Sequence, residues 1–415
     1  MKTNRHFYIG IAFLVMLTFA CSIFSAPVAP QPSFPEEPPT AAPPQAEEVP
    51  QAPVTEPEII SQYLPIGVAT STGSGLRVFD RLGYTLVKIN TPGLFYSDRS
   101  NLHLAGGLPE GSANLPVVYF SFEQNESLLL NTNGQISTLL PIPYFAGLAG
   151  ATGEPVVAYT TADLSTSGSL LGQLYVGRLE SLPTAAPVLT DDDPQGWALV
   201  ALAVDVENDE PVGVWYSKRP WGIGGDIVFD PRRTLSYLDL GTRTVSQFLG
   251  AEANPSAISA DRIWLAYTDD TSVGAGAGEM TIRNILSGVN ISFPLLPAVD
   301  PRGAGNAVFS PGNQYIAWME GNGFQMAETP NFHSVVRVGN MNGNTIAEFA
   351  DTALVTVSGL GIVQRVEPVG WFDDETLVIM ARGERWDETV LLKIDIPSKT
   401  PSFLAQGAFV GFVYP

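Results

Sequence analysis

The sequence predicts an all-β fold made of a ring of repeated sheets. A short apolar strand that ends in a bulky residue and a small one recurs six times along the 415 residues. The bulky residues lie 39, 57, 51, 51 and 62 residues apart, at Phe120, Tyr159, Tyr216, Tyr267, Trp318 and Met380. A mean period of about 52 residues is typical of β-propeller blades. The 40 glycines, 34 prolines and 15% charged residues also indicate a turn-rich β protein.

Residues 1–20 are expected to form an export signal. Lys2 and Arg5 precede an apolar run from Phe7 to Ala20. This run is too short to span a bilayer comfortably, but it has the length of a signal-peptide core. An uncleaved anchor helix is one alternative.

Cys21 is expected to carry a lipid. The segment from Leu17 to Cys21 resembles the signal of bacterial lipoproteins. In that family the cysteine is diacylated, which implies that Cys21 is the lipidation site, that the bilayer is a partner and that the mature protein is extracytoplasmic. Cys21 is also the single cysteine of the chain, and an unmodified thiol would be a liability in an oxidising compartment. The alternative is a plain signal peptide that is cleaved near Ala26.

Residues 21–62 are expected to be the lipidated cysteine and a linker. Pro, Ala, Glu and Gln dominate from Ala26 to Pro57. Such a segment cannot bury enough apolar surface to fold, and its prolines favour polyproline II. At about 3.1 Å per residue it would reach at most about 100 Å, which suits a disordered stalk. A ligand for a proline-recognition module is the alternative.

Residues 63–415 are expected to form the propeller. The clearest repeat has strands at 306–310, 314–320, 335–339 and 345–349, separated by turns that contain Asn and Gly. The segment from Phe309 to Trp318 resembles the Ser-Pro-Asp-Gly repeat of TolB-like and WD40-like β-propellers, and segments 258–267 and 370–377 are degenerate copies. In those families the motif joins the innermost strand of a blade to the second. The resemblance implies the fold and no particular activity.

The inner strands predict seven blades. Six complete blades have inner strands near Leu102, Tyr144, Trp197, Ala257, Val308 and Val369. The seventh must be composite, because residues 66–89 read as a blade without its first strand and residues 408–413 as an inner strand without followers. Joining the two ends closes the ring and removes an open sheet edge. A six-bladed ring is the alternative.

The long loops are expected to share one face of the ring. Loops that join second to third strands and crossings between blades lie on the same face of a propeller, and here they are long. The predicted loops are 162–170, 218–232, 270–278, 321–333 and 382–388, and the predicted crossings are 190–196, 297–304 and 350–364. Binding sites usually lie in long loops on a rigid scaffold, so we expect this loop face to hold the ligand.

Two tryptophans on the loop face are the candidate ligand contacts. Trp221 and Trp386 fall in predicted loops, beside Arg219 and Arg385 respectively, whereas the other five tryptophans fall in strands and are expected to pack. Trp and Arg are enriched at binding hot spots, and both stack on sugars or peptide aromatics. The alternative is structural: each tryptophan covers its own loop, and the arginines pair with the acids nearby, Asp226, Glu384 or Asp387.

Charge argues against several functions. The net charge is −21, and it becomes −23 once Lys2 and Arg5 leave with the signal, so nucleic acid is not an expected partner. Asp191–Asp193 and Asp269–Asp270 offer oxygen ligands for calcium but lack the spacing of a dedicated loop. We therefore expect no metal and no cofactor, and a monomer whose loop face binds a protein or a glycan.

Catalysis has little support in the sequence. Only His103 and His333 remain after export, and no Gly-x-Ser-x-Gly elbow occurs. No catalytic residue is therefore assigned. The alternative function is an exported propeller enzyme that acts on polysaccharide through paired loop carboxylates with raised pKa values.

Overall fold

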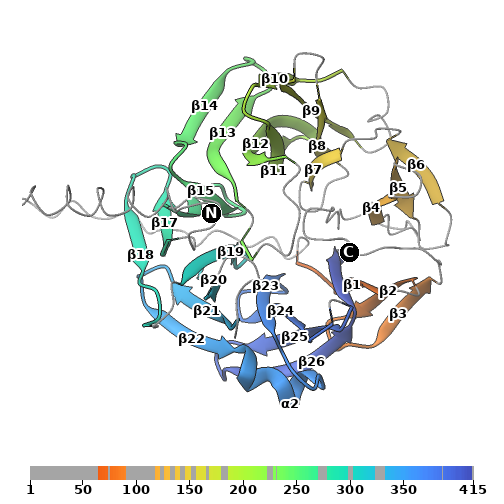
Figure 1. Cartoon of the computed structure of the whole chain (residues 1–415), viewed down its shortest axis with the longest axis vertical. Coiled ribbons are helices and arrows are strands. Elements are labelled where there is room, and N and C mark those ends of the chain that lie inside the picture. The colour runs from red at the N-terminus through yellow and green to blue at the C-terminus, as the bar shows by residue number, and fades with distance from the viewer. Residues whose placement is uncertain are drawn as a thin grey trace, which may run out of the picture. The chain divides into compact units, whose positions relative to one another are not determined.

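The computed structural model shows seven antiparallel sheets arranged in a ring (Figure 1). They lie in one compact unit, from Glu58 to Pro415. The structure describes residues 64–72, 75–89, 117–121, 126–130, 136–140, 145–150, 156–164, 168–178, 186–221, 228–229, 231–269, 278–297, 302–322, 332–385 and 387–413. The predicted signal peptide, Cys21, the whole of the predicted linker and the predicted inner strand near Leu102 lie outside the described residues. Among the described residues, no helix is long and apolar enough to cross a membrane.

We number the sheets as blades 1 to 7 and give their strands from the inside of the ring outward. Blade 1 holds β27 (Ala408–Val413), β1 (Gly67–Thr72), β2 (Gly75–Asp80) and β3 (Thr85–Ile89). Blade 2 holds β4 (Val117–Ser121), β5 (Glu126–Leu130) and β6 (Ile136–Leu140). Blade 3 holds β7 (Phe145–Gly150), β8 (Val156–Leu164), β9 (Leu170–Arg178) and β10 (Leu189–Asp193). Blade 4 holds β11 (Trp197–Glu207), β12 (Glu210–Pro220), β13 (Arg233–Asp239) and β14 (Val245–Leu249).

The remaining blades follow the same order. Blade 5 holds β15 (Asn254–Ile258), β16 (Trp264–Thr268), β17 (Met280–Asn284) and β18 (Asn290–Phe293). Blade 6 holds β19 (Gly303–Phe309), β20 (Tyr315–Gly321), β21 (Ser334–Asn340) and β22 (Thr345–Ala350), followed by two short helices, η4 (Asp351–Leu354) and α2 (Val355–Ser358). Blade 7 holds β23 (Arg365–Trp371), β24 (Thr376–Arg382), β25 (Thr389–Asp395) and β26 (Thr400–Gln406).

The two ends of the propeller close the ring in blade 1. The last strand, β27, pairs antiparallel with β1, and the Cα atoms of Gly67 and Ser71 stand opposite those of Val413 and Ala408. The backbone N–H of Ile66 extends the ladder by donating to the carbonyl oxygen of Val413 at 2.7 Å. The predicted composite blade and the predicted seven-bladed propeller are therefore confirmed.

The predicted turn motif has the geometry that a blade requires. Ser310 directly follows the inner strand of blade 6, and its Oγ accepts the N–H of Gln314 and of Tyr315, both at 3.1 Å. Asn313 has a left-handed φ of 55°. In the degenerate copy of blade 5, the Oγ of Ser259 likewise accepts a backbone N–H, from Trp264 at 2.9 Å. The serine therefore fixes the turn even where the Pro-Gly pair is missing.

The core lies between neighbouring sheets. Trp318 is fully buried in blade 6, where its ring packs against Phe293 of blade 5 with the ring centres 4.7 Å apart. Trp215 and Trp371 are also buried, as the strand periodicity predicts. Trp197 and Trp264 are half-buried, so strand position alone overestimates how deeply these two lie.

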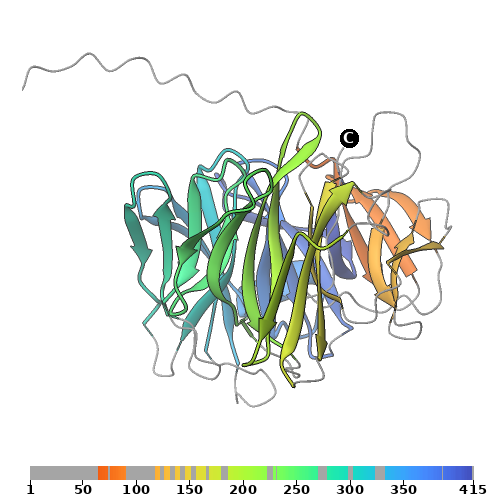
Figure 2. The same ribbon diagram turned by 90° about the horizontal axis from the view of Figure 1, so that it is seen from above.

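Some predicted loops are shorter than the sequence indicated, because strands continue into them. β12 runs to Pro220, whose Cα lies opposite that of Trp197, so Arg219 belongs to a strand and the predicted loop at 218 begins too early. β8 runs to Leu164, which faces Leu170 at the start of β9. β10 runs to Asp193, which shortens the predicted crossing 190–196. On the opposite face, the long β11–β12 hairpin projects from the ring (Figure 2).

Candidate functional site

Trp221 directly follows β12, at the loop-face end of blade 4. Its backbone N–H donates to the carbonyl oxygen of Gly196 at 3.0 Å. Its half-buried side chain packs against four buried residues of blades 3 and 4, namely Ala146, Ala162, Leu170 and Ala198. Trp221 is therefore a partly open aromatic surface, fixed at the boundary between two blades.

The other three predicted contacts are divided between two blades. Arg219 lies in β12 with its Cα opposite that of Ala198 and is half-buried. Arg385 lies in blade 7, where its 69% exposed side chain forks onto Asp387, with Nε 3.0 Å from Oδ1 and Nη2 2.8 Å from Oδ2. Trp386 lies outside the described residues. The structure thus brings Arg219 and Trp221 together, and it gives Arg385 the acidic partner that the structural alternative predicts.

Lys218 ties the ends of blades 3 and 4 together. Its Nζ lies 2.6 Å from Oδ2 of Asp191 and 2.9 Å from Oδ2 of Asp193, at the end of β10. The Oδ1 of Asp193 accepts the backbone N–H of Gln195 at 2.8 Å. Two of the three aspartates in the run Asp191–Asp193 therefore contact a cation of the protein itself. Among the described residues, no three His, Cys, Asp or Glu side chains gather closely enough to hold a metal ion.

This pairing shifts two pKa values. Burial acts to raise the pKa of Asp193, but the hydrogen bonds from Lys218 and from two backbone N–H groups outweigh it, so the pKa is lowered. Burial acts to lower the pKa of Lys218, but hydrogen bonds to Asp191 and Asp193 outweigh it, so the pKa is raised. A lowered carboxyl pKa is the opposite of what a general acid needs, so Asp193 does not support the enzymatic alternative.

Arg233 and Trp197 extend the same surface. The guanidinium carbon of Arg233 lies 3.7 Å from the ring centre of Trp197, which is a cation–π contact. Nη2 of Arg233 lies 3.2 Å from Oε1 of Gln195 and 3.8 Å from Oδ2 of Asp193. The stack holds the half-buried indole and the guanidinium in a fixed arrangement at the loop face.

These residues form what we call the rim patch: Trp197, Lys218, Arg219, Trp221 and Arg233. Two indoles offer flat apolar surface, and three cations offer donors for hydroxyl or carboxylate oxygens. Sequence reasoning missed Trp197, Lys218 and Arg233. Trp197 begins a strand, Arg233 follows a long loop, and the partners of Lys218 lie in the neighbouring blade. The register of β11 and β12 could have identified Trp197, because its Cα lies opposite that of Pro220, which stands between Arg219 and Trp221 in the sequence.

The loop between β12 and β13 reaches blades 6 and 7 with two of its residues. Val228 and Phe229 are buried against Met319 of blade 6. The carbonyl oxygen of Val228 accepts Nη2 of Arg365 in blade 7 at 2.9 Å and Nδ2 of Asn306 in blade 6 at 3.3 Å. Blades that are not neighbours meet near the axis of a ring, so this part of the β12–β13 loop lies there, against the inner strands.

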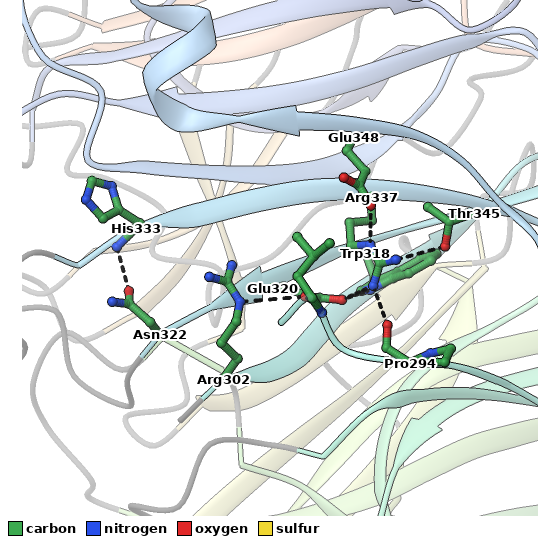
Figure 3. A network of polar contacts seen from close by, with 10 residues as sticks. Pro294, Arg302, Trp318, Glu320, Asn322, His333, Arg337, Thr345 and Glu348 are labelled. Atoms are coloured by element: carbon green, nitrogen blue, oxygen red, sulfur yellow. Dashed lines mark hydrogen bonds and ion pairs between the residues drawn. The ribbon is translucent and has the colours of Figure 1, made fainter. Parts of the chain in front are cut away.

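Blade 6 holds a second polar network (Figure 3). Glu320 is fully buried and pairs with Arg337, which also donates to the carbonyl oxygen of Pro294 at 2.6 Å. The backbone N–H of Leu296 donates to Oε2 of Glu320 at 3.0 Å. Arg337 lies over Trp318, with the guanidinium carbon 5.2 Å from the ring centre. This network fastens the crossing from blade 5 to the sheet of blade 6, which is a structural role.

Comparison with known proteins supports the fold. No protein family matches the sequence, and no curated protein is similar to it. Similar solved structures include TolB from Acinetobacter baumannii, with 14% identity, a TM-score of 0.43 and 70% of this chain aligned to 64% of that one. An oligogalacturonate lyase in complex with manganese has 12% identity, a TM-score of 0.48 and coverages of 83% and 85%. A prolyl endopeptidase has 8% identity, a TM-score of 0.50 and coverages of 83% and 51%.

These similarities are distant. The chain spans less than two thirds of the TolB structure and about half of the prolyl endopeptidase. The similar structures include a lyase and a peptidase, so the shared β-propeller fold does not determine a function. The function has to be argued from the side chains at the loop face.

Proposed function

We propose that the chain is an exported lipoprotein, held at a membrane by acylated Cys21, whose propeller binds a protein or a glycan through the rim patch. The observation that carries the binding role is the rim patch itself. Half-buried Trp197 and Trp221 stand beside the cations of a strongly acidic protein, at the blade ends where loops meet. Fixed aromatic and guanidinium groups of this kind dominate the energetics of many interfaces.

The anchoring role is supported by the sequence. A signal-like apolar run ends at the single cysteine, and a proline-rich segment separates that cysteine from the first strand of the propeller. A single acyl chain binds a bilayer weakly, whereas two chains give stable attachment, which is what a diacylated cysteine provides. The stalk would then hold the binding face clear of the lipid surface.

Replacement of Cys21 tests the anchor. We expect Cys21→Ser to abolish incorporation of labelled fatty acid and to move the protein out of the membrane fraction of a bacterial host, because the acidic propeller has little affinity for a bilayer. A variant that keeps its label and stays on membranes would show that the lipoprotein interpretation is wrong.

Replacement of the rim patch tests binding. We expect Trp221→Ala and Arg233→Ala each to weaken capture of a partner, from a glycan array or from envelope proteins of the native host, by about 2 kcal/mol. Asn342→Ala is the matched control, since Asn342 is exposed in the β21–β22 hairpin on the opposite face. If both rim variants capture the partner as well as the parent does, the rim patch is not the binding site.

A further inference from the structure

The chain enters the propeller on the face opposite the loop face. β27 follows the crossing from blade 7 and runs away from the loop face to Val413, where β1 begins with Gly67 opposite it. The backbone N–H of Ile66 donates to the carbonyl oxygen of Val413 at 2.7 Å, so the chain reaches blade 1 at this far face. We call it the turn face. It also carries the β2–β3 turn and the β11–β12 hairpin that projects from the ring (Figure 2).

Exposed apolar side chains gather where the chain enters. Leu82 and Tyr84 belong to the β2–β3 turn and are 69% and 70% exposed. Ile66 is 43% exposed and adjoins the turn, because the next residue, Gly67, has its Cα opposite that of Asp80, where the turn starts. We call Ile66, Leu82 and Tyr84 the apolar tip. Apolar groups that gather at a surface in this way are typical of an interaction site.

The β2–β3 turn holds the apolar tip in a fixed position. Oδ1 of Asp80 accepts the backbone N–H of Leu82 at 2.9 Å and that of Tyr84 at 2.8 Å. Arg81, which follows Asp80, pairs with Asp373 of blade 7. The tip is therefore ordered before it meets a partner, which lowers the entropy cost of binding.

Blade 1 is basic in an acidic protein. Residues 64–89 contain three cations, Arg77, Arg81 and Lys88, and one acid, Asp80, and β27 adds no charge. The whole chain has 21 basic and 42 acidic residues. Arg81 already has a partner, but Arg77 and Lys88 stand opposite one another on β2 and β3, and Lys88 is exposed. A surface of anionic headgroups attracts such a region, whereas it repels the rest of the protein.

The far side of the turn face is less suited to a lipid surface. Blades 4 and 5 lie across the ring from blade 1 (Figure 1). Leu286 is exposed in the β17–β18 hairpin of blade 5, but residues 254–293 contain four acids and two cations. The projecting hairpin of blade 4 carries Glu207, Asp209 and Glu210 at its end. Repulsion from anionic headgroups therefore favours contact through blade 1.

We propose that the apolar tip docks on the surface of the bilayer that anchors the chain. Two observations favour lipid over a protein partner: the linker joins the propeller beside the tip, and the tip belongs to a basic blade of an acidic protein. Leucine and isoleucine side chains enter the headgroup boundary favourably, and tyrosine suits an interface that is apolar on one side and wet on the other. The inference rests on the lipid anchor of the proposed function.

Docking orients the rim patch. Three side chains bind a bilayer weakly, but an anchored domain meets the surface at a high effective concentration. Release of the protein from membranes on loss of Cys21 is therefore still expected. The tip and the rim patch lie on opposite faces of the ring, so a docked propeller presents the rim patch to partners outside the anchoring bilayer.

A dye on a tethered chain tests docking. The chain from residue 21 onward carries Cys21→Ser and an N-terminal histidine tag, and nickel-chelating lipids hold it on vesicles, so the result does not depend on acylation. Cys21 is the single cysteine, so one introduced thiol carries the dye, at Thr85→Cys beside the tip or at Pro194→Cys on the loop face. A quencher in the lipid headgroups should quench the dye at Thr85 at least about threefold more than the dye at Pro194.

Variants separate docking from chance contact. The tip variant, Leu82→Ser with Tyr84→Ser, should lower quenching at Thr85 to the level at Pro194. It should fold as the parent does, because it changes exposed side chains of a turn whose backbone hydrogen bonds remain. Leu286→Ser is the matched control, since Leu286 is an exposed leucine of the same face in blade 5, and it should leave quenching at Thr85 unchanged.

Lipid charge tests the cations. Vesicles of phosphatidylcholine are compared with vesicles that also contain phosphatidylglycerol. We expect stronger quenching with the anionic lipid, and a return to the neutral level in Arg77→Gln with Lys88→Gln. Equal quenching on both vesicles that is still lost in the tip variant supports docking through the apolar side chains alone.

Three results would overturn the proposal. Quenching that is equal at the two dye positions, or that persists in the tip variant, means that the apolar tip does not touch lipid. Loss of quenching in Leu286→Ser instead places the contact at blade 5. A tip variant that changes the sedimentation coefficient of the untethered chain, but not the quenching, shows that the tip pairs with a second copy. Each result leaves the anchor standing, because fractionation of Cys21→Ser tests the anchor separately.

Discussion

Blades 4 and 6 carry the same chemistry in different surroundings. Each has a guanidinium over a tryptophan and near a carboxylate. In blade 4 these are Arg233 and Trp197, with Asp193 of the neighbouring blade 3, and in blade 6 they are Arg337, Trp318 and Glu320. In blade 6 the arginine is 7% exposed and the glutamate is fully buried. In the rim patch, the side chains of Arg233 and Lys218 are 21% and 23% exposed. Residue types alone therefore do not distinguish a buried network from an open one, whereas exposure does.

The crossings explain the difference in exposure. In blade 6 the incoming crossing donates Leu296 N–H to Glu320 and accepts Arg337 with the carbonyl of Pro294, so the chain itself covers the ion pair. The crossing into blade 4 is short, because β10 ends at Asp193 and β11 begins at Trp197. The three residues between these strands are too few to cover Lys218 and Arg233. The length of one crossing thus decides which network stays exposed.

The largest effect is expected in the buried network. Glu320→Gln should lower the free energy of unfolding by about 3–5 kcal/mol, because it leaves the buried Arg337 without its main counter-charge. Glu348→Gln is the matched control: Glu348 is 43% exposed and should contribute about 1 kcal/mol or less. Denaturant unfolding measures both. Similar losses for the two variants would contradict the difference drawn between buried and exposed partners.

The loop that joins the two regions should have the next largest effect. Phe229 lies within the β12–β13 loop, whose two ends adjoin the rim patch, and its ring fills the space against Gly305, where a Cβ would lie 2.5 Å from Cδ1. Phe229→Ala should cost about 3 kcal/mol and expose the loop to limited proteolysis. Leu286→Ala, at an 82% exposed position, should stay within about 0.5 kcal/mol. Equal effects would mean that the loop is not anchored at blade 6.

The smallest effect concerns the pH dependence of the rim patch. The pKa of Asp193 is lowered by folding, so its contribution is present above the unfolded value of about 4 and is lost as the pH falls through the folded value. The pKa of Lys218 is raised, so its contribution is lost only as the pH rises above about 10. Asp193→Asn should cost about 1–2 kcal/mol at pH 7 and flatten the acid limb of a stability–pH curve. An unchanged acid limb would contradict this assignment.

The sequence predicts the ring better than the site. Blade period, turn residues and the unpaired terminal strands are local patterns, and they led to seven blades and to the pairing of β27 with β1. The tryptophan and arginine pairs were chosen because they lie in predicted loops. This criterion selects Arg219 and Trp221 together, but it does not say which residues of a neighbouring blade they meet. Lys218 and Asp193 are separated by a strand and a hairpin, and their contact follows from how blade 3 packs on blade 4, which no local pattern encodes. The same holds for Asp351 and His333, which η4 brings together.

The central claim is that the rim patch contacts a ligand, and site-specific photo-crosslinking tests it directly. A photoreactive residue at the exposed Pro194, beside the rim patch, is compared in the native host with one at Asn342 on the opposite face. We expect a discrete adduct from Pro194 that disappears when Arg233→Ala is added, and none from Asn342. Adducts from Asn342 alone, or a Pro194 adduct that survives Arg233→Ala, would contradict the claim.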